Sequence, residues 1–124
     1  MSNNDFTITA IDHWRLDVPF HERCAHTVEV RVPGWSVVDL YRVTLASGVV
    51  GVGETLENYT WGKIGDEAAQ QYLGRNAWEL IWDDDLGAGL QMALFDAVGK
   101  SAAVPVHRLL GTQYREACPV SWWA

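Results

Sequence analysis

The stretch at positions 88–111 constrains the fold of this 124-residue chain more than any other part. Pro105 interrupts its helical pattern, and a short apolar turn then ends at Gly111. Large apolar side chains widen the helical face until little of it is left for solvent, which is typical of a buried helix. The stretch therefore predicts a buried central helix, a break and a second short helix with a glycine C-cap. The residues that define the helical face are Leu90, Leu94, Ala97 and Val98.

Three earlier stretches alternate between apolar and polar residues, as half-buried β-strands do. They cover Phe6 to Val18, Ser36 to Ala46 and Val49 to Leu56. Ser47-Gly48 supplies a tight turn between the last two, which predicts an antiparallel hairpin. The first strand is irregular only at Ile11 and Asp12, and we expect one side of it to carry Phe6, Ile8, Ala10, Trp14, Leu16 and Val18.

Two polar segments follow the first and last predicted strands. Phe20 to His26 shows no period and is predicted to be a loop, while Val28 to Val32 alternates as a short edge strand or part of a mobile flap. Glu57 to Lys63 is a second loop, polar and aromatic. The glycines of Gly51-Val52-Gly53-Glu54, inside the third strand, indicate a bulge or a close backbone approach.

Helical signals begin again at Asp66 and at Asn76, both predicted N-caps, and Glu79 could complete a capping box with Asn76. Trp78, Ile81 and Trp82 would form the apolar side of that second helix. The acidic run at positions 83–85 lacks the spacing of a calcium loop and is interpreted as a solvated turn. Strands followed by helices predict an α+β fold, a three-stranded antiparallel sheet packed against a helical bundle.

Composition narrows the class of protein further. A formal net charge of −7 argues against a nucleic-acid or anionic-membrane partner, because both favour a basic surface. Cys24 and Cys118 lie far apart and lack the spacing of a zinc site. The amino terminus has no secretion signal and no apolar run approaches a membrane span, so we expect a cytoplasmic protein.

The central helix also carries a resemblance to a known family. Positions 93–100, Ala-Leu-Phe-Asp-Ala-Val-Gly-Lys, precede Pro105-Val106 and Leu109-Leu110-Gly111, and a strand with Gly51-Val52-Gly53-Glu54 lies upstream. Together they resemble the amino-terminal capping domain of the enolase superfamily, in its mandelate racemase and muconate lactonizing branch. Ala103 departs from the pattern, because a glycine is common there.

The resemblance implies that the chain is a lid and not a complete enzyme. In this family the cap lies over a (β/α) barrel that holds Mg²⁺ and removes the proton next to a substrate carboxylate. Residues 1–111 correspond to the capping domain, and 112–124 resemble a linker and the first strand of a barrel that is otherwise missing, so the chain is interpreted as a fragment. No catalytic residue or metal ligand is expected on it.

The same resemblance implies that the two polar loops contact a small carboxylate substrate, such as an acid sugar. An arginine would suit such an anion by bidentate pairing, although each of these side chains could equally be an ordinary surface group or a loop anchor. Asp96 and Lys100 are read as a helix ion pair. The candidate substrate-binding residues are His21, Arg23, His26, Trp35, Glu54, Tyr59 and Trp61.

Two functions follow from these observations. The first is a substrate-enclosing cap of a Mg²⁺-dependent lyase or isomerase, of the acid-sugar dehydratase or racemase type. The second is a stand-alone binding or assembly module without catalysis. Members of this family often associate, which leaves a homo-oligomer open.

Overall fold

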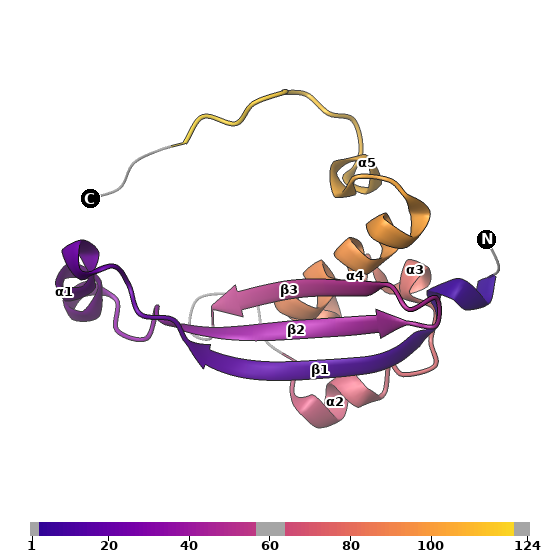
Figure 1. Ribbon diagram of the computed structural model, residues 1–124, viewed down its shortest axis with the longest axis horizontal. Helices are drawn as coiled ribbons and strands as arrows, with labels where there is room; N and C mark the ends of the chain where they lie inside the picture. The colour runs from indigo at the N-terminus through magenta and orange to yellow at the C-terminus, as the bar shows by residue number, and fades with distance from the viewer. Residues whose placement is uncertain (1–2, 57–63, 121–124) are drawn as a thin grey trace.

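A computed structural model describes residues 3–56 and 64–120 of the chain. Its three strands form one antiparallel sheet in the order β1-β2-β3, with helices packed against it (Figure 1). This confirms the predicted α+β fold with a three-stranded sheet. In chain order the elements are η1 (Asn3–Phe6), β1 (Ile8–Asp17), α1 (Glu22–Arg31), β2 (Val37–Leu45), β3 (Val50–Leu56), α2 (Asp66–Gln70), α3 (Ala77–Leu80), η2 (Asp84–Leu86), α4 (Gly87–Ala102) and α5 (Val106–Leu110).

The core lies between the sheet and α4, whose face is buried as predicted. Gly51 and Gly53 of β3 allow the helix backbone to come very close to the sheet. A Cβ added to Gly51 would lie 2.1 Å from the carbonyl oxygen of Ala93, and one added to Gly53 would lie 2.2 Å from that of Gly89. The glycines in this strand therefore mark a close backbone approach. Buried side chains of β2 and α4 that meet here include Tyr41, Val43, Leu45, Leu90, Leu94 and Val98.

A bulge near the start of β1 changes which side of the strand faces the core. Ile8 pairs with Leu45, but Ala10 pairs with Thr44, so the register shifts between them. One extra residue reverses the faces of everything that follows. The prediction that Trp14, Leu16 and Val18 share the side of Ile8 is therefore wrong, and these three side chains are exposed. The irregularity at Ile11, which is buried, was the sign of this bulge.

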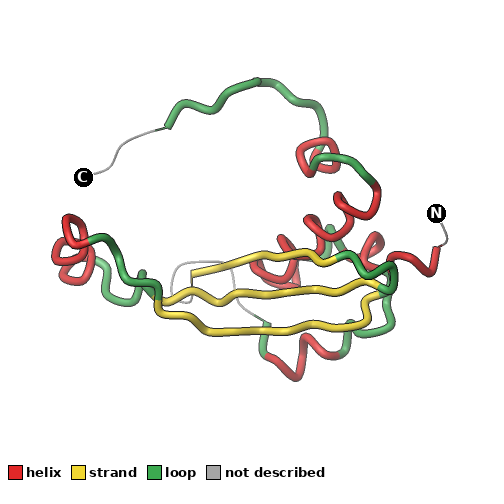
Figure 2. The backbone as a smooth tube through the Cα atoms, viewed as in Figure 1, coloured by secondary structure: helices red, strands yellow, loops and turns green. Residues whose placement is uncertain are grey.

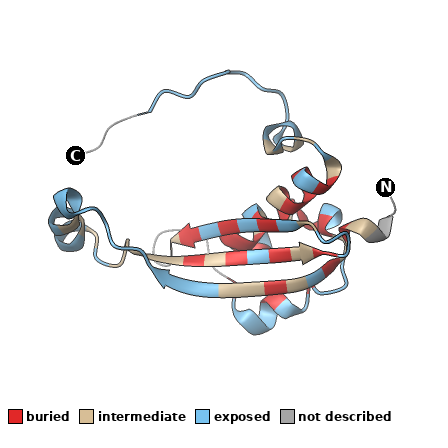
Figure 3. Cartoon of the chain, in the orientation of Figure 1, coloured by how far each residue is buried: buried red, intermediate tan, exposed pale blue. Residues whose placement is uncertain are grey.

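The segment after β1 is a helix, where we expected a loop and then a short strand or flap. α1 begins after His21, whose Nδ1 accepts a hydrogen bond of 3.4 Å from the backbone N–H of Arg23. Its alternating valines suggested a strand, but Val28 and Val32 also lie one helical turn apart. No residue of α1 is buried, and the helix lies beyond one end of the sheet (Figure 3).

The shorter helices follow the predicted signals with two corrections. The cap of α2 is Gly65, so Asp66 is the first helical residue and not the N-cap. Asn76 caps α3 as predicted, because its Oδ1 accepts a 2.9 Å hydrogen bond from the N–H of Trp78. Trp78 and Trp82 are both more exposed than their predicted places on the apolar side of the helix imply. Trp78 contacts Phe6 edge-on, with ring centroids 5.4 Å apart.

The predicted sequence of helix, break and capped short helix is confirmed. α4 ends at Ala103, which has left-handed backbone angles, and the N–H of Val104 donates a 2.9 Å hydrogen bond to the carbonyl of Gly99. Pro105 is the N-cap of α5 and Gly111 its C-cap. Residues 112–120 are exposed and form neither helix nor strand, so the predicted barrel strand is not seen there; positions 121–124, with Trp122 and Trp123, lie outside the described residues.

Candidate functional site

Both predicted substrate loops leave the sheet at the same end. Asp17 at the end of β1 pairs with Val37 at the start of β2, and Leu56 at the end of β3 pairs with Val38. α1 connects the first two of these strand ends, and β3 ends beside them at Leu56 (Figure 2). The topology therefore brings α1 and the end of β3 to the same end of the sheet, whereas residues 57–63 lie outside the described residues.

Three of the predicted site residues lie together on α1 or at its start. His21 is the N-cap, and Arg23 and His26 are one turn apart on the helix, so they share a face. All three side chains are exposed. This places two imidazoles and a guanidinium on a short helix whose side chains are not needed for the core.

The other predicted residues are more scattered. Trp35 is half-buried in the turn that leads into β2. Glu54 is exposed on the outer face of β3, where it pairs in register with Leu40. Tyr59 and Trp61 lie outside the described residues, so their predicted contacts remain predictions.

A charged cluster that we did not predict lies on the inner face of the sheet. His13 Nε2 is 2.8 Å from Asp39 Oδ1, and His13 Nδ1 is 2.6 Å from Asp66 Oδ1. The Asp39 side chain is fully buried, while that of Asp66 is mostly exposed. Each imidazole nitrogen of His13 therefore lies within hydrogen-bond distance of a carboxylate oxygen. The cluster ties β1 to β2 and to the start of α2.

Tyr41 extends this cluster towards Ile64, two residues before α2. Its ring stacks on that of His13 with centroids 4.6 Å apart, and its hydroxyl donates a 3.0 Å hydrogen bond to the carbonyl of Ile64. Burial, and then the negative charges of Asp39 and Asp66, raise the pKa of the phenol to about 12. Tyr41 is therefore a neutral donor that holds Ile64 against the sheet.

One signal in the sequence could have revealed this cluster. The alternation of β2 places Asp39 on the same side as Val37, Tyr41 and Val43, which is the core side. A buried carboxylate needs a hydrogen-bonding or cationic partner, and His13 on the neighbouring strand was available. His13 is not among the residues predicted on the side of Ile8, and the bulge in β1 brings it to the core side.

Comparisons with known proteins agree with this architecture. No family model matches the chain. A chloromuconate cycloisomerase from Cupriavidus pinatubonensis (strain JMP 134 / LMG 1197) is 51% identical over 105 residues, a match that covers 67% of this chain and 28% of that protein. The crystal structure of muconate cycloisomerase from Pseudomonas fluorescens superimposes with a TM-score of 0.62 at 24% identity, covering 94% of this chain and 35% of that one.

A muconate lactonizing enzyme from Pseudomonas putida has the same fold, with a TM-score of 0.59 at 24% identity over 88% of this chain and 33% of that one. The chain is an enolase-superfamily capping domain. It belongs to the mandelate racemase and muconate lactonizing branch. The capping domain spans about a third of the length of these relatives.

The resemblance places Mg²⁺ on a barrel, and the described side chains of the capping domain do not form a second site that would suit it. Within residues 3–56 and 64–120, no three His, Cys, Asp or Glu side chains are grouped so that they could hold a metal ion. In the cluster of His13, Asp39 and Asp66, both imidazole nitrogens already face carboxylate oxygens. We therefore assign no metal-dependent step to these residues. None of the described helices has the length and hydrophobicity that a membrane span needs.

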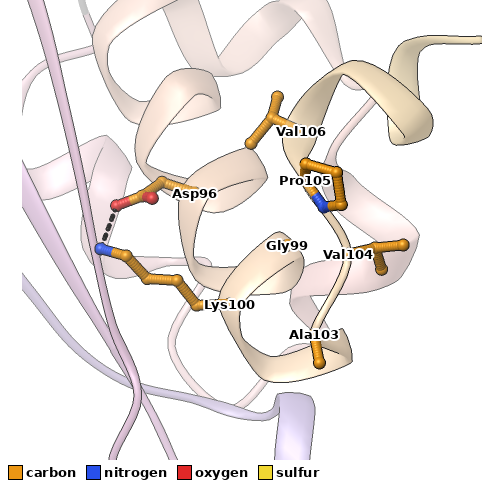
Figure 4. Close-up of a pocket in the computed structure, with 7 residues that line it drawn as sticks. All are labelled: Asp96, Gly99, Lys100, Ala103, Val104, Pro105 and Val106. Carbon is orange, nitrogen blue, oxygen red and sulfur yellow. Dashed lines mark hydrogen bonds and ion pairs between the residues drawn. The ribbon is translucent and has the colours of Figure 1, made fainter.

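A shallow hollow of about 380 Å³ lies where α4 ends and α5 begins (Figure 4). Gly99, Ala103 and the Val104–Val106 turn line it, and Asp96 and Lys100 form an ion pair of 2.6 Å at its side. This confirms the predicted helix ion pair. The pair also contacts the backbone of β3, so these two charges are already engaged within the fold.

Proposed function

We propose that this capping domain encloses the substrate of a cycloisomerase-type enzyme and helps to select the carboxylate that the enzyme accepts. The observation that carries the proposal is the 51% identity to a chloromuconate cycloisomerase. Muconate is a dicarboxylate, so the proposed substrate class is an unsaturated or halogenated dicarboxylic acid. This relative favours cycloisomerisation over the acid-sugar dehydration or racemisation that the sequence resemblance also allowed.

Arg23, His21 and His26 supply the chemistry that such a substrate needs. A guanidinium can hold a carboxylate with two parallel hydrogen bonds, and an imidazole can donate one more. α1 has no buried residue, so these side chains can approach a ligand without unfolding the core. Proton abstraction and metal binding belong to a barrel in this family, and the capping domain would contribute binding and the exclusion of water.

A chimera tests the proposal directly. The capping domain replaces the matching segment of the chloromuconate cycloisomerase, and kcat/KM is measured with muconate and with chloromuconate. We expect an active chimera, in which Arg23→Ala lowers kcat/KM by roughly tenfold or more, the effect of losing a charge-assisted hydrogen bond. Arg108→Ala, a change of the same kind on α5, serves as the control and should have little effect.

A folded chimera without activity, or equal losses from both arginine variants, would contradict the proposal. The coding sequence beyond Ala124 gives an independent test. An open frame with carboxylates at the ends of successive predicted strands supports an enzyme. A stop codon in an intact gene whose product is a soluble monomer favours the stand-alone binding module.

A further inference from the structure

β3 is an edge strand whose outer backbone groups are covered by two side chains of α4. Among the described residues its only strand neighbour is β2. The backbone N–H of Val52 donates a 2.9 Å hydrogen bond to Asp96 Oδ2, and Lys100 Nζ donates one of 3.0 Å to the carbonyl of Val50. Both side chains point towards the strand in Figure 4. A free edge offers these same groups to another strand.

The Asp96–Lys100 ion pair makes the hydrogen bonds that a neighbouring strand would make to Val50 and Val52. A C=O and an N–H two residues apart on an edge are bonded by the N–H and C=O of an added strand. Here the Lys100 ammonium replaces the donor and the Asp96 carboxylate replaces the acceptor. The 2.6 Å bond between Lys100 Nζ and Asp96 Oδ2 holds the two groups together.

The other edge of the sheet is covered in a different way. The carbonyl of Ile11 on β1 accepts a hydrogen bond of 3.2 Å from Gln70 Nε2. The backbone of Ile8 bonds at 2.9 Å to that of both Gly74 and Arg75. A chain segment therefore lies against β1, whereas at Val50 and Val52 the cover consists of two partly exposed side chains.

We infer that Asp96 and Lys100 form an edge cap that prevents β3 from pairing with β3 of a second copy of this chain. The occupant is a second copy because every molecule presents the same edge, and because Val50 and Val52 also expose apolar side chains that such a pairing would cover. Exposed, flat and apolar edge strands are the sites at which sheets join. Removing the edge cap leaves β3 as such an exposed edge strand.

The test compares two double variants of the full chain. Asp96→Ala with Lys100→Ala removes the edge cap, whereas Asp12→Ala with Arg42→Ala removes another partly exposed ion pair, which joins two strands that are already paired. Analytical ultracentrifugation follows the mass of each protein from micromolar to millimolar concentration. We expect only the first variant to form species larger than the wild type, with a share that rises with concentration.

Hydrogen exchange keeps the inference testable if the double variant folds poorly. Asp96→Asn keeps an acceptor oxygen, and Asp96→Ala removes it. We expect the Val52 amide to exchange about tenfold faster in the alanine variant than in the asparagine variant. Unchanged mass in a folded double variant, equal association of the Asp12/Arg42 control, or equal exchange in the two Asp96 variants would overturn the inference.

Discussion

At the scale of single residues, Gly53 determines how closely α4 lies on the sheet. We expect Gly53→Ala to lower the free energy of unfolding by about 3 kcal/mol or more, because its Cβ would meet the helix backbone, which cannot move aside like a side chain. Gly65→Ala is the matched control, since no atom lies within 4 Å of its added Cβ. Urea unfolding measures the free energy of unfolding of both variants. If Gly53→Ala changes it only slightly, α4 can shift away from the sheet.

Tyr41 makes stability depend on pH in alkaline solution. Its pKa is raised from 10.0 to about 12, so the folded protein holds the phenol proton more tightly than the unfolded chain. The native state therefore binds more protons in this window, and the free energy of unfolding should fall as the pH rises from 10.0 to about 12. Urea unfolding at several pH values should show this decline in the wild type. An equal decline in Tyr41→Phe would refute the assignment.

At the scale of elements, the end of α4 contains a correctable defect. Ala103 has φ 56° and ψ 37°, a left-handed conformation that favours glycine. We expect Ala103→Gly to raise the free energy of unfolding by about 1 kcal/mol. Ala102→Gly, one residue earlier and still helical, should lower it by a similar amount. Chemical denaturation measures the free energy of unfolding of both variants. A lower value than that of the wild type in both would contradict the left-handed cap geometry at Ala103.

The elements predicted correctly are those whose signals are local. The β2–β3 hairpin follows from alternation around Ser47-Gly48, and α4 follows from a long apolar face that ends before Pro105. Two other elements depend on information outside their own residues. The bulge after Ile8 is fixed by pairing with β2, and α1 forms although its β-branched Val28 and Val30 favour a strand.

The candidate site was predictable only in part for the same reason. Alternation along β2 places Asp39 on the core side, which is a local signal. Its partner His13 comes from β1, and Asp66, which contacts the other nitrogen of His13, comes from α2. These residues lie 26 and 27 positions from Asp39 in sequence, and only the folded chain brings the three together. The position of α1 at one end of the sheet likewise depends on which strands pair.

At the scale of the whole molecule, the capping domain is expected to be a poor metal binder. Its net charge of −7 attracts cations, but the described residues hold no group of three ligands that could bind one. Isothermal titration of this chain with Mg²⁺ should therefore show weak binding that disappears at high salt, because surface attraction is screened. A tight, stoichiometric site that survives salt would contradict this expectation.

α1 contributes no buried side chain, whereas α4 contributes a large share of the core. Substitutions in α1 should therefore change folding free energy very little, since exposed positions without structural contacts are usually nearly neutral. Under the proposed function, the residues that set ligand preference and the residues that stabilise the fold lie in different parts of the chain. Such a division allows evolutionary drift, or a directed library at positions 22–31, to explore new substrates while the scaffold stays intact.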